Sequence, residues 1–382
     1  MKPGRFQRVA KANRGKLMLA IATSLILSIS IGLAHADRGG GTAHAPKRGH
    51  APKCGRVNAE YVPSCGGWFG TTGAPTLAAG EAIAGRRADI FHEYKSFASY
   101  AGSRSFPGRS AEAAIDSHHM YFFDWKPLAV GGGIIPWREV ASGAADANYV
   151  DALARKIRNW SAAHHHGKVF MAFHAEPEDE IGKYGTPAEY VAAWQHIDAR
   201  FRALGARRSV IFVWDMTGYM TRVPLWNALY PGDRVIDWLA WDPYGKTPDN
   251  PVSAPVVPFP LALGQDKGRR PDSTGAYRFY KWADGPGAAA YGTGRVYRKP
   301  GSHQKPLMVA EFSVCWASST LMQAQRWYGQ AGTVLRKGRY PRVKAFVYFD
   351  VAACEKPTGT ARMAANFRRA VSVSRLRQRR PY

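Results

Sequence analysis

Two short segments of the sequence place a glutamate directly behind an apolar run. Glu176 lies in the segment "KVFMAFHAEPEDE", and Glu311 lies in the segment "KPLMVAEFSV". A pair of carboxyl groups can divide acid–base work, because one can be held protonated while the other stays ionised. A solvated acidic loop is the alternative interpretation of the first segment, which carries three more carboxylates: Glu178, Asp179 and Glu180.

The elements that position these carboxylates are indicated by eight apolar runs. Each run is rich in β-branched and aromatic residues, which is typical of a strand covered on both faces. Helical periods lie between several of them, and one of these offers Thr186 as an N-cap with Glu189 three positions later. Eight strands that alternate with helices predict an α/β fold, the (β/α)8 TIM barrel. A doubly wound open sheet is the alternative, but no G-x-G-x-x-G motif follows the first run. The runs span residues 66–70, 88–97, 119–127, 168–178, 209–216, 235–245, 305–314 and 343–351.

In such a barrel the active site lies at the carboxyl ends of the strands. Carboxylates and aromatic residues dominate those positions in this sequence. They offer neither a basic cluster for phosphate nor the His triplet that a catalytic zinc prefers, so we expect no metal and no cofactor. The Pro- and Gly-rich connection 246–304 would lie over this end as a wall of the substrate cleft, with a disordered insertion as the alternative.

Both ends of the chain are expected to lie outside the barrel, which we assign to residues 61–365. Residues 1–36 combine a basic start, an apolar stretch and an Ala-His-Ala site, which predicts a secretory signal peptide; an uncleaved membrane anchor is the alternative. A flexible leader rich in Gly, Pro and Lys follows at 37–60, and a basic tail spans 366–382. We therefore predict a secreted protein.

The net charge of +25 favours contact with an anionic surface such as a cell-wall polymer. No helix-turn-helix, RNA-binding or zinc-finger spacing indicates a nucleic-acid partner, and a monomer is expected. Export makes disulfides the expected state of the four cysteines. Three pairings are open, and we favour Cys54–Cys65 with Cys315–Cys354, because the latter two follow adjacent strands.

Two carboxylates on facing strands of an exported, aromatic-rich barrel suggest glycoside hydrolysis. That reaction needs one carboxyl that protonates the leaving oxygen and a second that attacks the anomeric carbon or activates water. Because aromatic rings stack on sugars, Trp125, Trp214 and Trp316 are candidate platforms. Four more residues are candidates for hydrogen bonds to sugar hydroxyls: His92, Glu93, Asp124 and His174.

Several runs resemble motifs of glycoside hydrolase family 26, the mannanases of the retaining (β/α)8 clan. "FHAEPE" resembles the strand-four motif that carries the acid/base, which implies that role for Glu176, and "KPLMVAEFSV" is similar to the strand-seven motif of the nucleophile, which implies Glu311. "VIDWLAWDPYG" resembles the strand-six motif whose Tyr hydrogen-bonds the nucleophile, here Tyr244. "VIFVWDM" looks like the strand-five segment that supplies a platform, here Trp214. The resemblance implies a retaining glycosidase that cleaves β-linked polysaccharide, most commonly β-mannan.

Three alternatives stay open at this point. Glu178 or Asp179 could be the acid instead of Glu176, because Pro177 marks where the strand ends. The chain could be a catalytically silent barrel that binds carbohydrate or cell wall. A secreted nucleic-acid or phosphate enzyme is the third alternative, and it rests on the charge alone.

Overall fold

The computed structural model describes residues 57–372, with internal gaps. Predictions that fall outside the described residues are the signal peptide, the leader before residue 57, Cys54, Trp316, Cys315 and Cys354, and nearly all of the connection 246–304. The gaps are residues 75, 117, 219–222, 245–278, 280–282, 284–304, 315–320, 338–341 and 352–356.

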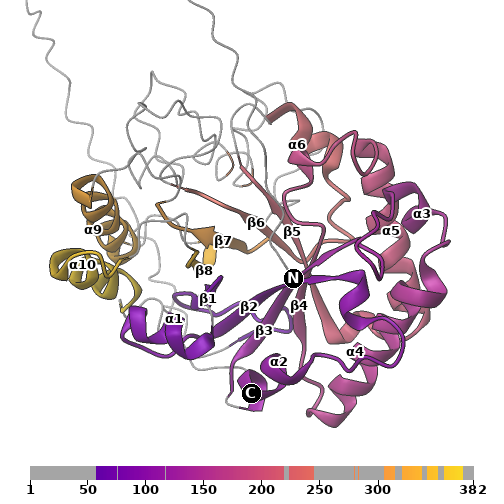
Figure 1. Cartoon of the computed structure of the whole chain (residues 1–382), viewed down its shortest axis with the longest axis horizontal. Coiled ribbons are helices and arrows are strands. Elements are labelled where there is room, and N and C mark those ends of the chain that lie inside the picture. Colours follow the sequence, from indigo (N-terminus) through magenta and orange to yellow (C-terminus); the bar gives the residue numbers. More distant parts are fainter. Residues whose placement is uncertain are drawn as a thin grey trace, which may run out of the picture. The chain divides into compact units, whose positions relative to one another are not determined.

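Eight parallel strands close into a barrel, which confirms the predicted (β/α)8 fold. Each strand pairs with the next one along the chain, and the last strand pairs with the first. Figure 1 shows the strands at the centre and the helices outside them. The strands are β1 (Trp68–Thr72), β2 (Ile90–Ser96), β3 (Met120–Lys126), β4 (Val169–Phe173), β5 (Val210–Met216), β6 (Trp238–Trp241), β7 (Leu307–Phe312) and β8 (Val343–Phe349).

The helices begin where local signals favour a helix start. Helix α5 opens at the predicted capping box, where Thr186 accepts from the Glu189 N–H and the Glu189 carboxylate accepts from the Thr186 N–H at 2.7 Å. The predicted apolar stripe of α4 faces the core through Leu153, Ile157 and Trp160. The described helices are α1 (Leu77–Ala84), α2 (Arg109–Asp116), α3 (Trp137–Ala141), α4 (Asp151–Ala163), α5 (Pro187–Ala203), α6 (Val223–Leu229), α9 (Leu321–Lys337) and α10 (Ala361–Val371).

Side chains along each strand point alternately into the barrel and out toward the helices. Inward-facing residues such as Trp68, Phe122 and Trp238 form one buried cluster inside the barrel. The residues between them, such as Phe123 and Phe212, join a second and larger cluster against the helices. This alternation decides which residues at the strand ends can meet inside the barrel.

The segment 57–63 closes the end of the barrel where the strands begin. Tyr61 belongs to the interior cluster, and its hydroxyl accepts from the Lys168 N–H at 2.8 Å. The indole N–H groups of Trp68 and Trp238 donate to the carbonyls of Tyr61 and Glu60, each at 2.7 Å. The predicted leader boundary therefore lies too late in the chain, because residues 57–60 are part of the folded barrel.

The predicted tail boundary at residue 366 lies too early. Helix α10 continues to Val371 and packs against α9, and Phe367 and Ala370 are fully buried there. An aromatic contact between Phe367 and Tyr328, with ring centroids 5.4 Å apart, joins the two helices. The many basic residues of this region made the apolar face of α10 hard to recognise in the sequence.

Two further predictions are tested only in part by the described residues. Cys65 is disulfide-bonded and its partner lies outside the described residues, so both pairings stay predictions. Among the helices that the structure describes, none has the length and apolar character needed to cross a membrane.

Candidate active site at the carboxyl end of the barrel

Buried acidic side chains line the carboxyl end of the barrel. Asp124, Asp215 and Asp242 each follow an apolar residue of the interior cluster by two positions, so the strand alternation points them inward. Burial, together with the charges of neighbouring carboxylates, raises the pKa of Asp215 and Asp242 well above its ordinary value. A chain with a net charge of +25 thus has an acidic barrel mouth.

Glu311 lies in this mouth because β7 is irregular at its end. Ala310 belongs to the interior cluster, and the next residue would normally face outward, but a register shift against β8 turns Glu311 inward. Its carboxylate accepts hydrogen bonds from the hydroxyls of Tyr94 on β2 and Tyr244 after β6. The expected contact of Tyr244 with Glu311 is therefore present, and Tyr94 adds a second one.

Glu176 reaches the mouth through an unusual backbone conformation just after β4. Its φ of 52° and ψ of 46° are left-handed, a region that costs a non-glycine residue energy. The Glu176 N–H donates to the Asp215 carbonyl at 3.1 Å, which fixes this turn against β5. Because Glu176 is only partly buried as a residue, a ligand in the mouth can reach it.

The environments of Glu176 and Glu311 separate the two carboxyls chemically. Burial raises the pKa of Glu176 well above its ordinary value, and the negative charge of Glu311 adds to the rise. Burial also raises the pKa of Glu311, but the hydrogen bonds from Tyr244 and Tyr94 oppose that rise. The pair therefore favours a protonated Glu176 beside an ionised Glu311.

The other carboxylates of the acidic segment differ from Glu176 in their contacts. Glu178 is 2% exposed and accepts from both the N–H and the hydroxyl of Thr217, at 3.1 and 2.9 Å. Glu180 forms an ion pair with Lys126 at 2.6 Å, and Asp179 is exposed. Glu178, the alternative acid, thus ties the β4 loop to the end of β5.

The two histidines expected near the site are buried beside it. His92 lies 3.1 Å from Asp124, Nε2 to Oδ2, and stacks on Phe122. His174 accepts at Nδ1 from the Trp137 indole N–H at 2.8 Å, so its neutral ring carries its proton on Nε2. Burial lowers the pKa of His174 well below its ordinary value, which favours this neutral form.

Three expected ligand contacts are not found in the mouth, for one physical reason. Trp125 and Trp214 are 0% exposed and pack among the helices, so the prediction that they are sugar platforms is wrong for this structure. Glu93 also faces outward, toward α2, where it accepts from Ser110 at 3.0 Å. Each of the three lies one position away from an inward-facing residue, and the alternation turns it to the other side.

Tyr94 is the residue that the sequence analysis missed. It lies two positions after the inward-facing His92, its hydroxyl donates to Glu311, and it is 48% exposed. An exposed aromatic ring beside a buried carboxylate could serve as a platform for a sugar ring. Strict alternation along β2 from His92 would have pointed to Tyr94 instead of Glu93.

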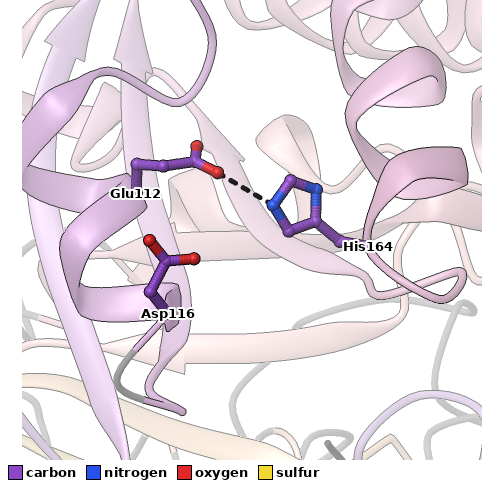
Figure 2. Close-up of side chains that lie close together, drawn as sticks. All are labelled: Glu112, Asp116 and His164. Atoms are coloured by element: carbon purple, nitrogen blue, oxygen red, sulfur yellow. Dashed lines mark ion pairs between the residues drawn. The ribbon is translucent and has the colours of Figure 1, made fainter.

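A second group of polar side chains lies away from this mouth. Glu112 and Asp116, one turn apart on α2, point toward His164 at the end of α4, and an ion pair of 2.8 Å joins His164 to Glu112 (Figure 2). The three side chains are near enough to one another to hold a cation. Because β3 and β4 begin just after these helix ends, the cluster lies toward the opposite end of the barrel from Glu311.

Together, the fold and the mouth define a (β/α)8 barrel with one glutamate just after β4 and another on β7 at the carboxyl end of the strands. No family model matches the sequence, and no curated protein matches it either. Among solved structures, the chain is similar to GH26C from Muricauda sp. MAR_2010_75, with a TM-score of 0.50 and 12% identity over 81% of this chain and 86% of that one. It is also similar to a double mutant of the Cellulomonas fimi endo-β-1,4-mannanase, with a TM-score of 0.50 and 14% identity over 82% of this chain and 74% of that one. At these identities the comparison shows a shared barrel fold.

Proposed function

We propose that this protein is a retaining glycoside hydrolase that cleaves β-linked polysaccharide. Glu311 is the nucleophile and Glu176 is the acid/base. The observation that carries the proposal is the different environment of the two carboxyls. Two tyrosine hydroxyls donate to Glu311 and oppose the rise of its pKa, while burial and the charge of Glu311 raise the pKa of Glu176 well above its ordinary value. A non-catalytic binding barrel would not need this difference.

The reaction proceeds in two displacements. Glu311 attacks the anomeric carbon, and the bond from that carbon to the leaving oxygen breaks as Glu176 transfers its proton to that oxygen. The product is a glycosyl ester of Glu311 and an ionised Glu176. Glu176 then removes a proton from water, which attacks the same carbon and releases Glu311 with the original configuration at the sugar.

The substrate we propose is a neutral β-mannan-like polysaccharide. A solved structure with the same barrel is an endo-β-1,4-mannanase, which supports mannan as the first candidate. The carboxylates of the mouth argue against an anionic chain at the reaction centre, because like charges repel strongly in a buried site. We propose export of the protein, with the basic surface serving for contact with an anionic cell wall.

A panel of polysaccharides tests the proposed function. We expect release of reducing ends from β-mannan by the full-length protein, and proton NMR at early times should show the β-anomer as the first product. The Glu311→Gln variant is the matched control and should release none. Absence of hydrolysis on mannan, β-1,3-xylan and mixed-linkage glucan, combined with binding, would instead identify a silent carbohydrate-binding barrel.

Glu178→Gln should keep most of the activity and change how stability depends on pH. Burial raises the pKa of Glu178 from 4.5 to about 7. Its folded state therefore binds a proton that the unfolded chain loses, and the free energy of unfolding falls as pH rises from 4.5 to about 7. The full loss in the free energy of unfolding over this pH range is about 3 kcal/mol. The Glu178→Gln variant should not show this loss. Chemical denaturation at pH 5 and pH 8 measures this difference.

The exposed Glu139 of α3 offers a matched control, since Glu139→Gln changes the same chemical group at the surface. It should keep the wild-type pH dependence. Turnover by Glu178→Gln should stay within about tenfold of the wild type, because Glu178 is buried and its oxygens accept hydrogen bonds from Thr217. An inactive Glu178→Gln beside a fully active Glu176→Gln would transfer the acid role to Glu178.

A further inference from the structure

The cluster of Glu112, Asp116 and His164 brings together two carboxylates and an imidazole. Glu112 and Asp116 lie one turn apart on α2, and His164 directly follows the last residue of α4. One ligand atom from each of the three side chains lies within 4.8 Å of the other two (Figure 2). Ligand atoms placed tetrahedrally around Zn²⁺ are roughly 3.3–3.6 Å apart. Small movements of the side chains would therefore let all three bind one ion.

The two carboxylates of α2 are unfavourable neighbours in the absence of a cation. Like charges four positions apart on a helix repel each other. Asp116 is also the last residue of α2, where the negative end of the helix dipole disfavours a carboxylate. In the part of the chain that the structure describes, only His164 forms an ion pair with Glu112, and no ion pair or hydrogen bond holds the Asp116 carboxylate. A divalent cation would neutralise both carboxylates.

A hydrogen bond outside the cluster sets the tautomer of His164. The Nδ1 atom of His164 lies 2.8 Å from the carbonyl oxygen of Trp160. Because a carbonyl oxygen can only accept, Nδ1 carries the hydrogen. In the neutral ring, the lone pair of Nε2 then faces the Glu112 Oε1 atom at 2.8 Å. Two acceptors at this distance repel each other unless a proton or a metal ion is bound to Nε2.

The ring of His164 is supported as the rings of metal-binding histidines usually are. Such a histidine donates its other ring N–H to a backbone carbonyl or a carboxylate, as Nδ1 of His164 does to Trp160. The imidazole also stacks on the Trp160 indole, with ring centroids 4.8 Å apart and an angle of 20° between the planes. Both contacts direct Nε2 toward the carboxylates of α2 before any ion binds.

The set of donor atoms distinguishes between classes of cation. Ca²⁺ and Mg²⁺ prefer oxygen ligands alone. An imidazole nitrogen combined with carboxylate oxygens suits Zn²⁺. The side chains of Glu112 and His164 are 36% and 30% exposed, so an ion can enter from solution and water can complete its coordination.

We propose that Glu112, Asp116 and His164 bind one Zn²⁺ ion, which joins α2 to the end of α4. The cluster lies toward the amino end of the barrel, where residues of this fold contribute to stability, whereas the sequence predicts no metal at the carboxyl end. The ion therefore stabilises the folded barrel and takes no part in the proposed reaction. This inference does not depend on the proposed function.

Thermal unfolding of the full-length protein, first freed of metal with EDTA, tests the proposal. An ion that binds only the folded state stabilises it, so saturating Zn²⁺ should raise Tm by at least about 3 °C. Ca²⁺ at the same concentration should raise Tm by less than about 1 °C. Asp116→Asn and Glu112→Gln keep the shape of each side chain and remove its charge. Each should remove most of the Zn²⁺ effect on Tm and weaken Zn²⁺ binding in calorimetry at least about tenfold.

Exposed residues outside the cluster supply the matched controls. His165→Asn removes the next histidine, and Asn tolerates the left-handed backbone of that position, where φ is 53°. Glu139→Gln removes an exposed carboxylate of α3. Both variants should keep the wild-type affinity for Zn²⁺ and the wild-type rise in Tm.

Three results would overturn the proposal. Zn²⁺ binding that is lost in His165→Asn and kept in Asp116→Asn would assign the ion to the run of three histidines, residues 164–166. An equal rise in Tm with Ca²⁺ would contradict the role of the imidazole. A wild-type Tm that Zn²⁺ does not change would leave a proton as the only link between His164 and Glu112. Hydrolysis of mannan well below Tm should be the same with and without Zn²⁺, so the two proposals fail in different measurements.

Discussion

Glu311→Gln should abolish turnover while leaving the fold and substrate binding intact. Gln has the shape of Glu and can still pair with Tyr94 and Tyr244, but its amide cannot attack the anomeric carbon. We expect kcat on mannan to fall by a factor on the order of 10⁴ or more. Steady-state kinetics measures the loss, and calorimetry on mannohexaose checks that affinity remains.

Azide gives an independent test of the role of Glu311. In Glu311→Gly, azide can occupy the space of the lost carboxylate and attack an activated aryl β-glycoside from that side. The product expected is the glycosyl azide of inverted configuration. A variant that azide does not rescue, or a Glu311→Gln protein with substantial activity, would contradict the assignment of the nucleophile.

Glu176→Ala should give the second large effect, and its size should depend on the leaving group. Loss of the general acid is expected to slow cleavage of mannan by a factor of about 10²–10⁴. Aryl glycosides with acidic leaving groups need no proton, so the formation of their glycosyl-enzyme should be nearly unaffected. Azide should then react with that intermediate and give the glycosyl azide of retained configuration.

The pH profile distinguishes Glu176 from its neighbours. The first step needs Glu176 in its protonated form, and burial raises the pKa of this group well above its ordinary value. Wild-type kcat/KM should therefore fall as pH rises through that raised pKa, and the residual activity of Glu176→Ala should lack this basic limb. Glu178→Gln is the control that should keep it. A basic limb that survives in Glu176→Ala would assign the limb to another group.

The barrel could be predicted because its strands are buried on both faces. Runs such as "SVIFVWDM" are apolar throughout, and the capping residues Thr186 and Glu189 marked the start of α5 in advance. The ends of the fold were harder to predict. Residues 57–60 contact Lys168, just before β4, and Trp238 of β6, and no local sequence pattern records such distant contacts.

From the sequence, the candidate site could be predicted only to the extent of which residues lie at the ends of the strands. The contact of Tyr244 with Glu311 followed from the strand-six motif, but the direction of each side chain depends on register. Trp125 and Trp214 were selected by residue type although the alternation turns both outward. Glu311 faces inward only because β7 is irregular, and the buried Glu178 is hydrogen-bonded by Thr217, which directly follows β5. These facts belong to the tertiary structure.

The closed base of the barrel has a consequence for how the chain can fold as it is made. Residues 57–63 leave the ribosome before every strand, yet the carbonyl of Glu60 is bound by Trp238, 178 positions later. At ordinary rates of synthesis that interval lasts roughly 10–40 s. The carbonyl of Glu60 must therefore wait for its partner until β6 has been translated. Folding of this protein cannot proceed simply from its first residue to its last.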